Sequence, residues 1–305
     1  MDPYLIGLDW GISSLRAYLM DDKSEIIDSV ASQSGIMQVG ERSFEEVLQA
    51  SIGSWLSRYL DAPILACGMI ASPQGWLEAP YVSCPAGLAE VVKNLCSLEM
   101  QARRKVWFVP GVMRRAEDNT PDVMRGEETQ IFGAVQDDSK RCSFILPGTH
   151  SKWALVEKGR IVWFATFMTG ELFDVLCKHS ILGRLMEEGG QDDDTFLMGL
   201  ECSAEGMNSN AGLLNKLFSV RSRGLFEEIP KTGLQSYLSG LLIGAEVTEA
   251  TRRIKDKTLM RLIGDSRLLK LYAKALEFFG WPSKMESENL TARGLACIAM
   301  SAELK

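Results

Sequence analysis

The chain has 305 residues, of which 46% are hydrophobic and 24% carry a charge, and its formal net charge is −7. This length allows two domains with buried cores, and the composition is ordinary for a globular protein. The negative charge disfavours duplex nucleic acid and anionic membrane surfaces as main partners. No apolar stretch reaches the length of a membrane span, and the N-terminus lacks a signal-peptide pattern, so we expect a cytoplasmic protein.

The seven cysteines are scattered along the chain, and there are only two histidines. They form no pair with the spacing of a zinc site, and an odd number of cysteines without a framework is typical of reduced thiols. The sequence also lacks the GxxxxGK[ST] loop, a GxGxxG fingerprint after a strand, GxSxG and HExxH. Nucleophilic hydrolases and His-based metal enzymes are therefore disfavoured.

The first half of the chain alternates short apolar runs with amphipathic segments. Strands are predicted at 4–9, 14–20, 25–30, 64–67 and 106–109, the first three as a β-meander. A helix is predicted over 43–60, because Ser43 can cap it and Glu46 follows three residues later. A second helix is expected near 86–99.

The second half repeats this order. A strand at 144–146 precedes a hairpin whose strands, 153–156 and 161–167, flank a turn at 157–160. Helices are expected near 171–187, 195–201, 209–219, 232–254, 266–279 and 289–302, with a short strand at 259–264 and a loop at 189–194. The duplicated order predicts two domains, 1–137 and 138–305, with the polar stretches 114–122 and 136–141 as breaks.

An acid followed by a tight small-residue turn ends the first predicted strand. In Asp9-Trp-Gly-Ile-Ser-Ser-Leu-Arg16, the backbone of Gly11 and the hydroxyls of Ser13 and Ser14 can surround a phosphate, and Asp9 can hold Mg²⁺ through water. An ordinary hairpin explains this pattern equally well. A second turn of the same kind, Gly148-Thr149, follows a strand at the equivalent place of the second half. Lys152 lies just beyond it, where it either adds positive charge to the phosphate site or is a surface strand residue. Two such turns favour a nucleotide held from both halves.

Two adjacent acids, Glu127 and Glu128, open a predicted helix after Gly126. Carboxylates are favoured in the first helical turn by the helix dipole, which explains the pair without function. The functional interpretation is that one carboxylate serves as base for a substrate hydroxyl. A strand ending in Gly264-Asp265-Ser266 can place backbone against adenosine, although a plain helix cap explains it too.

These segments resemble the phosphate-1, phosphate-2 and adenosine segments of the actin/hexokinase/Hsp70 superfamily, in that chain order. The resemblance implies an α/β fold with two actin-like ATPase (ribonuclease H-like) domains flanking an ATP cleft. Over residues 4 to 300 the chain is similar to the 2-dehydro-3-deoxygalactonokinase family. The motifs that carry this similarity are Asp9-Trp-Gly, Leu15-Arg-Ala, Gly68-Met, Gly75-Trp, Ala79-Pro-Tyr, Val123-Met-Arg-Gly-Glu-Glu-Thr-Gln, Pro147-Gly-Thr-His-Ser-Lys-Trp, Thr169-Gly-Glu-Leu and Leu238-Ser-Gly-Leu-Leu-Ile-Gly-Ala-Glu.

The resemblance implies a kinase that uses ATP and Mg²⁺ to phosphorylate 2-dehydro-3-deoxy-D-galactonate at its 6-hydroxyl during galactonate breakdown. Asp9 then belongs to the Mg²⁺ shell, and Glu127, which lies before Thr149, is favoured over Glu128 as base. The nucleotide residues are Gly11, Ser13, Ser14, Arg16, Gly148, Thr149, Lys152, Gly264, Asp265 and Ser266. Position 12 is Ile where the family usually has a small hydroxyl residue, so Ser13 or Ser14 must supply the phosphate donor that is missing there.

A cation is needed for the carboxylate of a sugar acid, and a guanidinium suits its two oxygens. Arg125, Arg16 and Arg114 are the candidates, in that order. The resemblance places Gly68, Met69, Ser72, Trp76 and Glu171 around the sugar, although from its sequence context Trp76 is a packed core indole.

Three alternatives stay open beside this kinase. One is a kinase of another sugar acid, and another is a nucleotide-switched binding or regulatory protein on the same fold, which has no need of the two glutamates. The third is a phosphatase of phosphate chains, which the net charge of −7 disfavours. The expected partners are a small sugar acid and ATP, without nucleic acid or membrane, and a homo-oligomer is left open.

Overall fold

The structure, a computed structural model, describes residues 4–101, 103–135, 140–208, 212–254 and 257–304. It divides into two compact units, which are described separately. Unit 1 comprises Met1–Arg141, Ala154–Phe164 and Ser287–Lys305, and unit 2 comprises Cys142–Trp153 and Ala165–Glu286. The predicted boundary between residues 137 and 138 lies outside the described residues. Within the described part of the chain, no helix is both long and apolar enough to cross a membrane.

Unit 1 is built on a six-stranded sheet with the order β3-β2-β1-β4-β7-β6. Its strands are β1 (Leu5–Trp10), β2 (Leu15–Met20), β3 (Ile26–Ser32), β4 (Ile64–Cys67), β6 (Cys96–Glu99) and β7 (Lys105–Phe108). The first three form the predicted antiparallel meander, and β4 and β7 continue from β1 in parallel. An antiparallel meander followed by parallel strands is the ribonuclease H-like arrangement, so the predicted fold class is confirmed.

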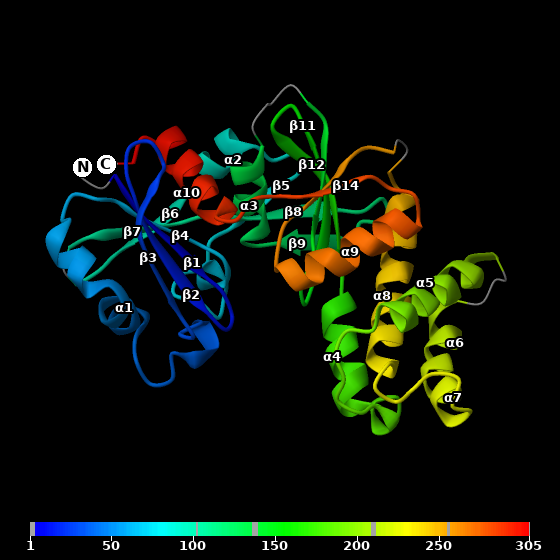
Figure 1. The fold of residues 1–305 in the computed structure, drawn as a ribbon. Helices are drawn as coiled ribbons and strands as arrows, with labels where there is room; N and C mark the ends of the chain where they lie inside the picture. Colours follow the sequence, from blue (N-terminus) through cyan, green and yellow to red (C-terminus); the bar gives the residue numbers. More distant parts are fainter. Residues whose placement is uncertain (1–3, 102, 136–139, 209–211, 255–256, 305) are drawn as a thin grey trace. The chain divides into compact units, whose positions relative to one another are not determined.

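Helix α1 (Phe44–Arg58) covers one face of this sheet (Figure 1). It begins as predicted: the Ser43 hydroxyl accepts from the Glu46 amide at 3.2 Å, while the Glu46 carboxylate accepts from the Ser43 amide at 2.7 Å. This reciprocal cap satisfies two amides that a helix start otherwise leaves unpaired. The buried face of α1 contributes Val47, Leu48, Ile52, Trp55 and Leu56 to the core.

The other face of the sheet carries α10 (Leu290–Ser301), which packs on β1, β4, α2 (Leu88–Lys93) and α3 (Glu127–Ala134). Helices α3 and α10 meet backbone to backbone, because a β-carbon added at Gly294 would lie 1.9 Å from the Thr129 carbonyl oxygen. The predicted second domain included this C-terminal segment, but in the structure residues Ser287–Lys305 belong to unit 1.

Two sequence predictions fail in unit 1. The helix expected near 86–99 ends with α2 at Lys93, and residues Cys96–Glu99 form β6, the edge strand antiparallel to β7. The polar stretch 114–122, expected as a domain break, lies mostly in an antiparallel hairpin of β8 (Gly111–Arg115) and β9 (Pro121–Met124). With β5 (Tyr81–Ser83), this hairpin forms a small sheet of order β5-β8-β9.

A five-stranded sheet has the order β12-β11-β10-β13-β14. Its strands are β10 (Cys142–Leu146), β11 (Ser151–Glu157), β12 (Arg160–Phe167), β13 (Met260–Leu262) and β14 (Ser283–Met285). Strands β11 and β12 form the predicted hairpin, closed by Lys158 and Gly159 with φ of 50° and 68°. Such positive φ angles are required at both centres of a two-residue turn. The strand β14 had no prediction.

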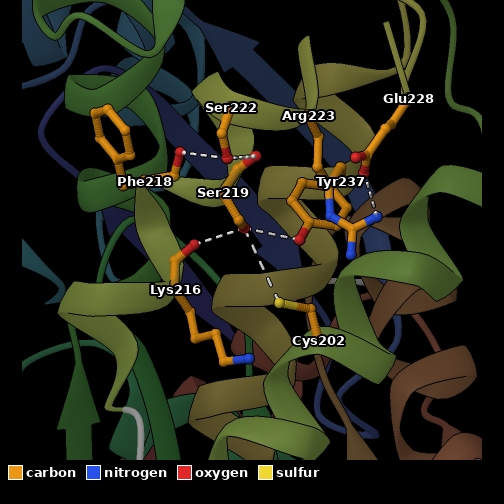
Figure 2. A network of polar contacts seen from close by, with 8 residues as sticks. All are labelled: Cys202, Lys216, Phe218, Ser219, Ser222, Arg223, Glu228 and Tyr237. Atoms are coloured by element: carbon orange, nitrogen blue, oxygen red, sulfur yellow. Dashed lines mark hydrogen bonds and ion pairs between the residues drawn. The ribbon is translucent and has the colours of Figure 1, made fainter. Parts of the chain in front are cut away.

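The helices of unit 2 are α4 (Thr169–His179), α5 (Asp193–Asn208), α6 (Leu213–Leu217), α7 (Ser219–Leu225), α8 (Leu234–Thr251) and α9 (Ser266–Phe278). Helix α8 packs against both α4 and α5 (Figure 1). A polar network joins three of these helices around Ser219, whose hydroxyl lies 2.8 Å from the Tyr237 hydroxyl and 4.0 Å from the Cys202 sulfur (Figure 2). The tyrosine of this network is fully buried.

Candidate active site

The acid at the end of β1 lies beside a wall made of glycine backbone. Strands β1 and β4 run parallel with Asp9 opposite Cys67, so Gly68 follows at the same edge of the sheet. Gly68 has a φ of 90°, and a β-carbon added to it would lie 2.9 Å from the Trp10 carbonyl oxygen and 3.6 Å from Asp9 Oδ1. A side chain at this position would therefore fill the space next to the carboxylate.

The turn after Asp9 is closed by its own hydrogen bond and is fixed by a second one from the segment at Ile36. The Gly11 amide donates to the Ser14 carbonyl at 2.9 Å, and the Ile36 amide donates to the Gly11 carbonyl at 3.0 Å. Gly35 packs so closely that an added β-carbon would lie 2.2 Å from the Ile12 carbonyl oxygen. Ile12 and Ser13 are exposed on the turn. The predicted phosphate-1 turn thus exists, and its Ile12 side chain projects away from the core.

Helix α3 begins against the same glycine wall. Gly126 precedes it with a φ of 107°, and a β-carbon there would lie 3.2 Å from the Gly68 α-carbon. The two predicted acids leave this point in different surroundings. Glu127 is half-buried and accepts from the Arg125 amide at 2.9 Å, whereas Glu128 is fully buried.

The electrostatics of the three acids follow from this crowding. Burial raises the pKa of the Asp9 carboxyl; Arg16, its partner across β1 and β2, opposes the rise, and Glu127 adds to it. Burial, with Glu127 beside it, raises the pKa of Glu128 to about 7. Glu128 accepts from the Gly126 amide at 2.7 and 3.0 Å and from the Thr129 hydroxyl at 2.9 Å. The Glu128 carboxylate is therefore already hydrogen-bonded to residues at the start of α3.

Within the described residues, two of the hydrogen-bond donors of Arg125 have no acceptor. Its side chain is 9% exposed, and Nη2 donates to the Ala79 carbonyl at 2.9 Å. Nε and Nη1 are buried with no hydrogen-bond partner, although the guanidinium lies 4.3 Å from the centre of the Tyr81 ring. Unpaired buried donors are rare in proteins and require an explanation.

The other two candidate arginines differ from Arg125. Arg114 Nε donates to the Phe164 carbonyl at 2.7 Å, and its guanidinium lies 5.5 Å from the centre of the Trp163 ring. Arg16 is exposed and faces Asp9 across the sheet. Of the three, Arg125 alone combines burial with unpaired donors.

Within unit 1, the residues predicted around the sugar do not all lie beside Asp9. Gly68 adjoins Asp9, and Met69 packs against the core of unit 1. Ser72 is buried, with its hydroxyl 3.4 Å from Gln74 Oε1. The Trp76 ring packs among those of Trp10, Phe44 and Phe108, at 6.0 to 6.4 Å between centroids, which is the core position that its context predicted.

Glu171 lies in α4 of unit 2 and contacts the Gly148-Thr149 turn. Its carboxylate contacts the His150 ring, and its amide donates to the Thr149 carbonyl at 2.9 Å. Gly170 packs against the same turn, because an added β-carbon would lie 2.3 Å from the Gly148 carbonyl oxygen. The start of α4 therefore holds the predicted phosphate-2 turn.

A cavity of about 840 Å³ opens beside this turn within unit 2. Pockets for small ligands typically measure about 300–1,000 Å³. Its lining includes Gly148, Thr169, Gly170, Ser236, Asp265 and Tyr272. Gly264 adjoins it, since a β-carbon there would lie 3.3 Å from the Pro147 carbonyl oxygen, and Ser266 opens α9 next to it.

Two of the predicted nucleotide residues form hydrogen bonds within the protein. Asp265 caps α9 by accepting from the Arg267 amide at 3.0 Å, as the plain-cap alternative predicted. Lys152 is 4% exposed, and its amine donates to the His150 carbonyl at 3.1 Å. The alternative that Lys152 is a surface strand residue is therefore wrong.

Three residues near these sites were not predicted. Thr291 of α10 donates to Asp9, Tyr81 stacks on Arg125, and Glu246 of α8 accepts hydrogen bonds from Ser151, Trp153, Tyr272 and Thr169. The motifs Ala79-Pro-Tyr and Leu238–Glu246 contain two of them, but nothing in those segments indicates the contacts.

The comparisons with known proteins agree on one family. The model of the family described as 2-keto-3-deoxy-galactonokinase matches residues 9–298. A Rhizobium meliloti (strain 1021) protein named as a 2-dehydro-3-deoxygalactonokinase is 33% identical over 97% of this chain and 96% of its own. The 2-dehydro-3-deoxygalactonokinase of Escherichia coli (strain K12) is 34% identical over 90% of each chain. A crystal structure named for the same enzyme, from Sinorhizobium meliloti, has a TM-score of 0.89 at 31% identity and covers 98% of this chain and 99% of that one.

Proposed function

Because the chain belongs to the 2-keto-3-deoxy-galactonokinase family, we propose that it transfers the terminal phosphoryl group of ATP to the 6-hydroxyl of 2-dehydro-3-deoxy-D-galactonate. The observation that carries this proposal is the pair of acids, Asp9 and Glu127, beside the backbone wall of Gly68 and Gly126. Phosphoryl transfer needs alignment and charge neutralisation more than covalent catalysis. Two carboxylates beside exposed glycine backbone can provide both the alignment and the charge neutralisation.

The first acid suits a Mg²⁺ ion. The Asp9 carboxyl has a raised pKa, and the hydrogen bond that it accepts from the Thr291 hydroxyl is 3.5 Å long. A cation would stabilise the ionised form of such a group. Mg²⁺ commonly binds one or two carboxylates together with water and phosphate oxygens, where it neutralises the charge that the phosphates carry. We therefore assign Asp9 to the ion that accompanies ATP.

The second acid suits the role of base. Glu127 is half-buried, while Glu128 is enclosed and hydrogen-bonded to Gly126 and Thr129. Only a carboxylate that a substrate reaches can accept the proton of its hydroxyl. In this proposal Glu127 accepts the proton of the 6-hydroxyl as its oxygen attacks the phosphorus, and Glu128 fixes the helix start.

The guanidinium of Arg125 suits the carboxylate of the sugar acid. Its Nε and Nη1 atoms are unpaired, and the planar fork of a guanidinium matches two carboxylate oxygens. Tyr81 stacks on this group and is 39% exposed, so a substrate that reaches Arg125 must pass its ring. Arg125 is two residues before Glu127 in the chain, so in this proposal one segment binds both ends of the substrate, the carboxylate at Arg125 and the 6-hydroxyl at Glu127.

The nucleotide is assigned to unit 2, whose cavity has a suitable volume and a wall of backbone at Gly148 and Gly170. Gly148 has open space where a side chain would lie, so its amide is accessible to a phosphate. Thr149 is exposed next to it. A cytoplasmic location, where ATP is available, is part of the same proposal.

The proposal is tested by measuring ATP consumption with a panel of 2-keto-3-deoxy sugar acids and plain sugars, and by the mass of each product. We expect turnover with 2-dehydro-3-deoxy-D-galactonate, a product heavier by one phosphoryl group, and no turnover with the matching sugar that lacks the carboxylate. Preference for another sugar acid would replace the substrate but keep the reaction. ATP binding without turnover of any acceptor would favour a nucleotide-switched regulatory protein.

A further inference from the structure

Helix α8 carries a buried carboxyl group that forms no ion pair with any cationic side chain in the described part of the chain. Glu246 is 3% exposed, and its Oε1 atom accepts from the Ser151 hydroxyl and the Trp153 indole, both at 2.7 Å. Oε2 accepts from the Tyr272 hydroxyl at 2.6 Å, and the Thr169 hydroxyl is a fourth partner. All four partners are neutral, and burial raises the pKa of Glu246.

The four partners come from three elements, of which α4 and α9 line the cavity of unit 2 and β11 lies next to one of its lining residues, Gly148, in the chain. Ser151 and Trp153 lie on β11, which begins directly after the Gly148-Thr149 turn. Thr169 is the first residue of α4, whose next residue packs on Gly148. Tyr272 lies on α9, the helix that Asp265 caps. Gly148, Thr169, Asp265 and Tyr272 all line the cavity, whereas Glu246 supports them from behind.

A buried ionisable group whose partners are all neutral is an expensive way to hold a core together, and an apolar residue of similar size commonly serves stability as well or better. A carboxylate differs in what it fixes, because each of its hydrogen bonds sets both the distance and the direction of a partner. From this geometry we propose that Glu246 is a positioning residue, which aligns the Gly148-Thr149 turn, the start of α4 and helix α9 for nucleotide binding. This rests on the proposed assignment of ATP to unit 2.

The substitution Glu246→Gln tests the role with almost no change in volume. The Trp153 indole can only donate, so the new amide must direct its oxygen toward Trp153 and Ser151. Its NH₂ group then faces the Tyr272 hydroxyl, and the direction of that hydrogen bond reverses. The single amide oxygen accepts from two partners only, so the contacts with both Tyr272 and Thr169 must change.

The readout is the Kd of a non-hydrolysable ATP analogue with Mg²⁺, measured by calorimetry without sugar acid, together with the KM for each substrate. We expect Glu246→Gln to raise this Kd and the KM for ATP by about tenfold, and to leave the KM for the sugar acid unchanged. Ser151→Ala, which removes one partner outside the cavity lining, should raise the Kd by less. The double variant should bind no more weakly than Glu246→Gln alone, because Ser151 acts through Glu246.

Tyr237→Phe is the matched control. It removes a buried hydroxyl from the same helix α8, but one that bonds Ser219 in the network of Figure 2 and not the cavity. It should lower the Tm while the Kd for the analogue stays at the wild-type value. If Glu246→Gln behaved in the same way, with a lower Tm and an unchanged Kd, Glu246 would be a structural residue only. If the wild-type chain did not bind the analogue at all, the nucleotide assignment itself would fail, and this inference with it.

Discussion

The Thr291 hydroxyl lies 3.5 Å from Asp9 Oδ2, although the two residues are 282 positions apart in the chain. Thr291 also accepts a hydrogen bond from the Gln130 side chain at 3.3 Å, so the C-terminal helix α10 connects the acid at the end of β1 to helix α3. Because α3 carries Glu127, the two proposed catalytic acids share one support. The predictions below begin with these acids.

Asp9→Asn should abolish turnover while the fold survives. The change removes the charge assigned to Mg²⁺ but keeps the volume, and loss of one such electrostatic contact commonly lowers kcat by ~10²–10³-fold or more. The Tm should not fall, because the carboxyl that is lost has a raised pKa and is therefore destabilising when ionised. The measurement is kcat with Mg·ATP beside a thermal melt. Near-normal activity would show that the phosphate-1 assignment is wrong.

Glu127→Gln and Glu128→Gln should act on different quantities. A positioned general base is commonly worth ~10²–10⁴-fold in rate, so Glu127→Gln should lower kcat by that order with ATP affinity nearly intact. Glu128→Gln should act mainly on stability or KM, since its carboxylate is enclosed by Gly126 and Thr129. The measurements are kcat and the Kd for ATP of both variants. Equal and small effects on kcat would show that the two glutamates only stabilise the start of α3.

Arg125→Lys should raise the KM for the sugar acid by ~10-fold or more, because an ammonium keeps the charge but loses the two-pronged fork. Arg114→Lys is the matched control, since that guanidinium is already bonded to the Phe164 carbonyl. The control should lower the Tm and leave this KM near its wild-type value. Equal shifts of KM in both variants would argue against a carboxylate site at Arg125.

The elements predicted correctly are those with local causes. The cap of Ser43 and Glu46 is complete within four residues, and the turn at Lys158 and Gly159 is set by its own backbone angles. The failures are strands whose partners lie elsewhere. Residues Cys96–Glu99 look helical in isolation, but they pair with β7, and only the assembled sheet makes them an edge strand.

The candidate site divides in the same way. Asp9, Glu127 and Gly148 stand in short motifs beside glycines, so their proximity to backbone walls was predictable from the sequence. Thr291 and Glu246 had no such indication, because their partners come from helices and strands that are distant in the chain. Arg125 was predicted as a cation for the substrate, but its burial and its stacking on Tyr81 follow from the small sheet that the sequence analysis missed.

Gly294→Ala should destabilise the protein and lower its activity together. The new β-carbon would lie 1.9 Å from the Thr129 carbonyl oxygen, so α10 must move away from α3 and carry Thr291 with it. Overpacking of this kind typically costs about 1–3 kcal/mol. The free energy of unfolding in urea and kcat measure the two effects.

Gly53→Ala in α1 is the control, because the nearest atoms to its added β-carbon belong to the flexible side chain of Gln49. It should leave activity unchanged and alter stability by less than about 1 kcal/mol. A wild-type kcat in Gly294→Ala would show that the fit of α10 on α3 does not matter to the acids.

The final prediction concerns the pH dependence of stability. The pKa of Glu128 is about 7 in the folded chain and near its usual value of 4.5 when unfolded, so the folded state binds this proton more tightly. The stabilisation that comes from the bound proton is complete below pH 4.5 and is lost as the pH rises through 7. Its full size is about 3 kcal/mol as an order of magnitude.

Glu128→Gln resembles the protonated form at every pH. It should therefore equal the wild type in urea unfolding at about pH 5 and exceed its free energy of unfolding at about pH 8. Glu46→Gln is the control with the opposite sign: hydrogen bonds from Ser43 lower the pKa of Glu46, so its contribution is present above the unfolded pKa, throughout this range. The free energy of unfolding of Glu46→Gln should be lower than that of the wild type by the same amount at both pH values. If Glu128→Gln instead showed a constant difference from the wild type, Glu128 would not be the group that titrates between them.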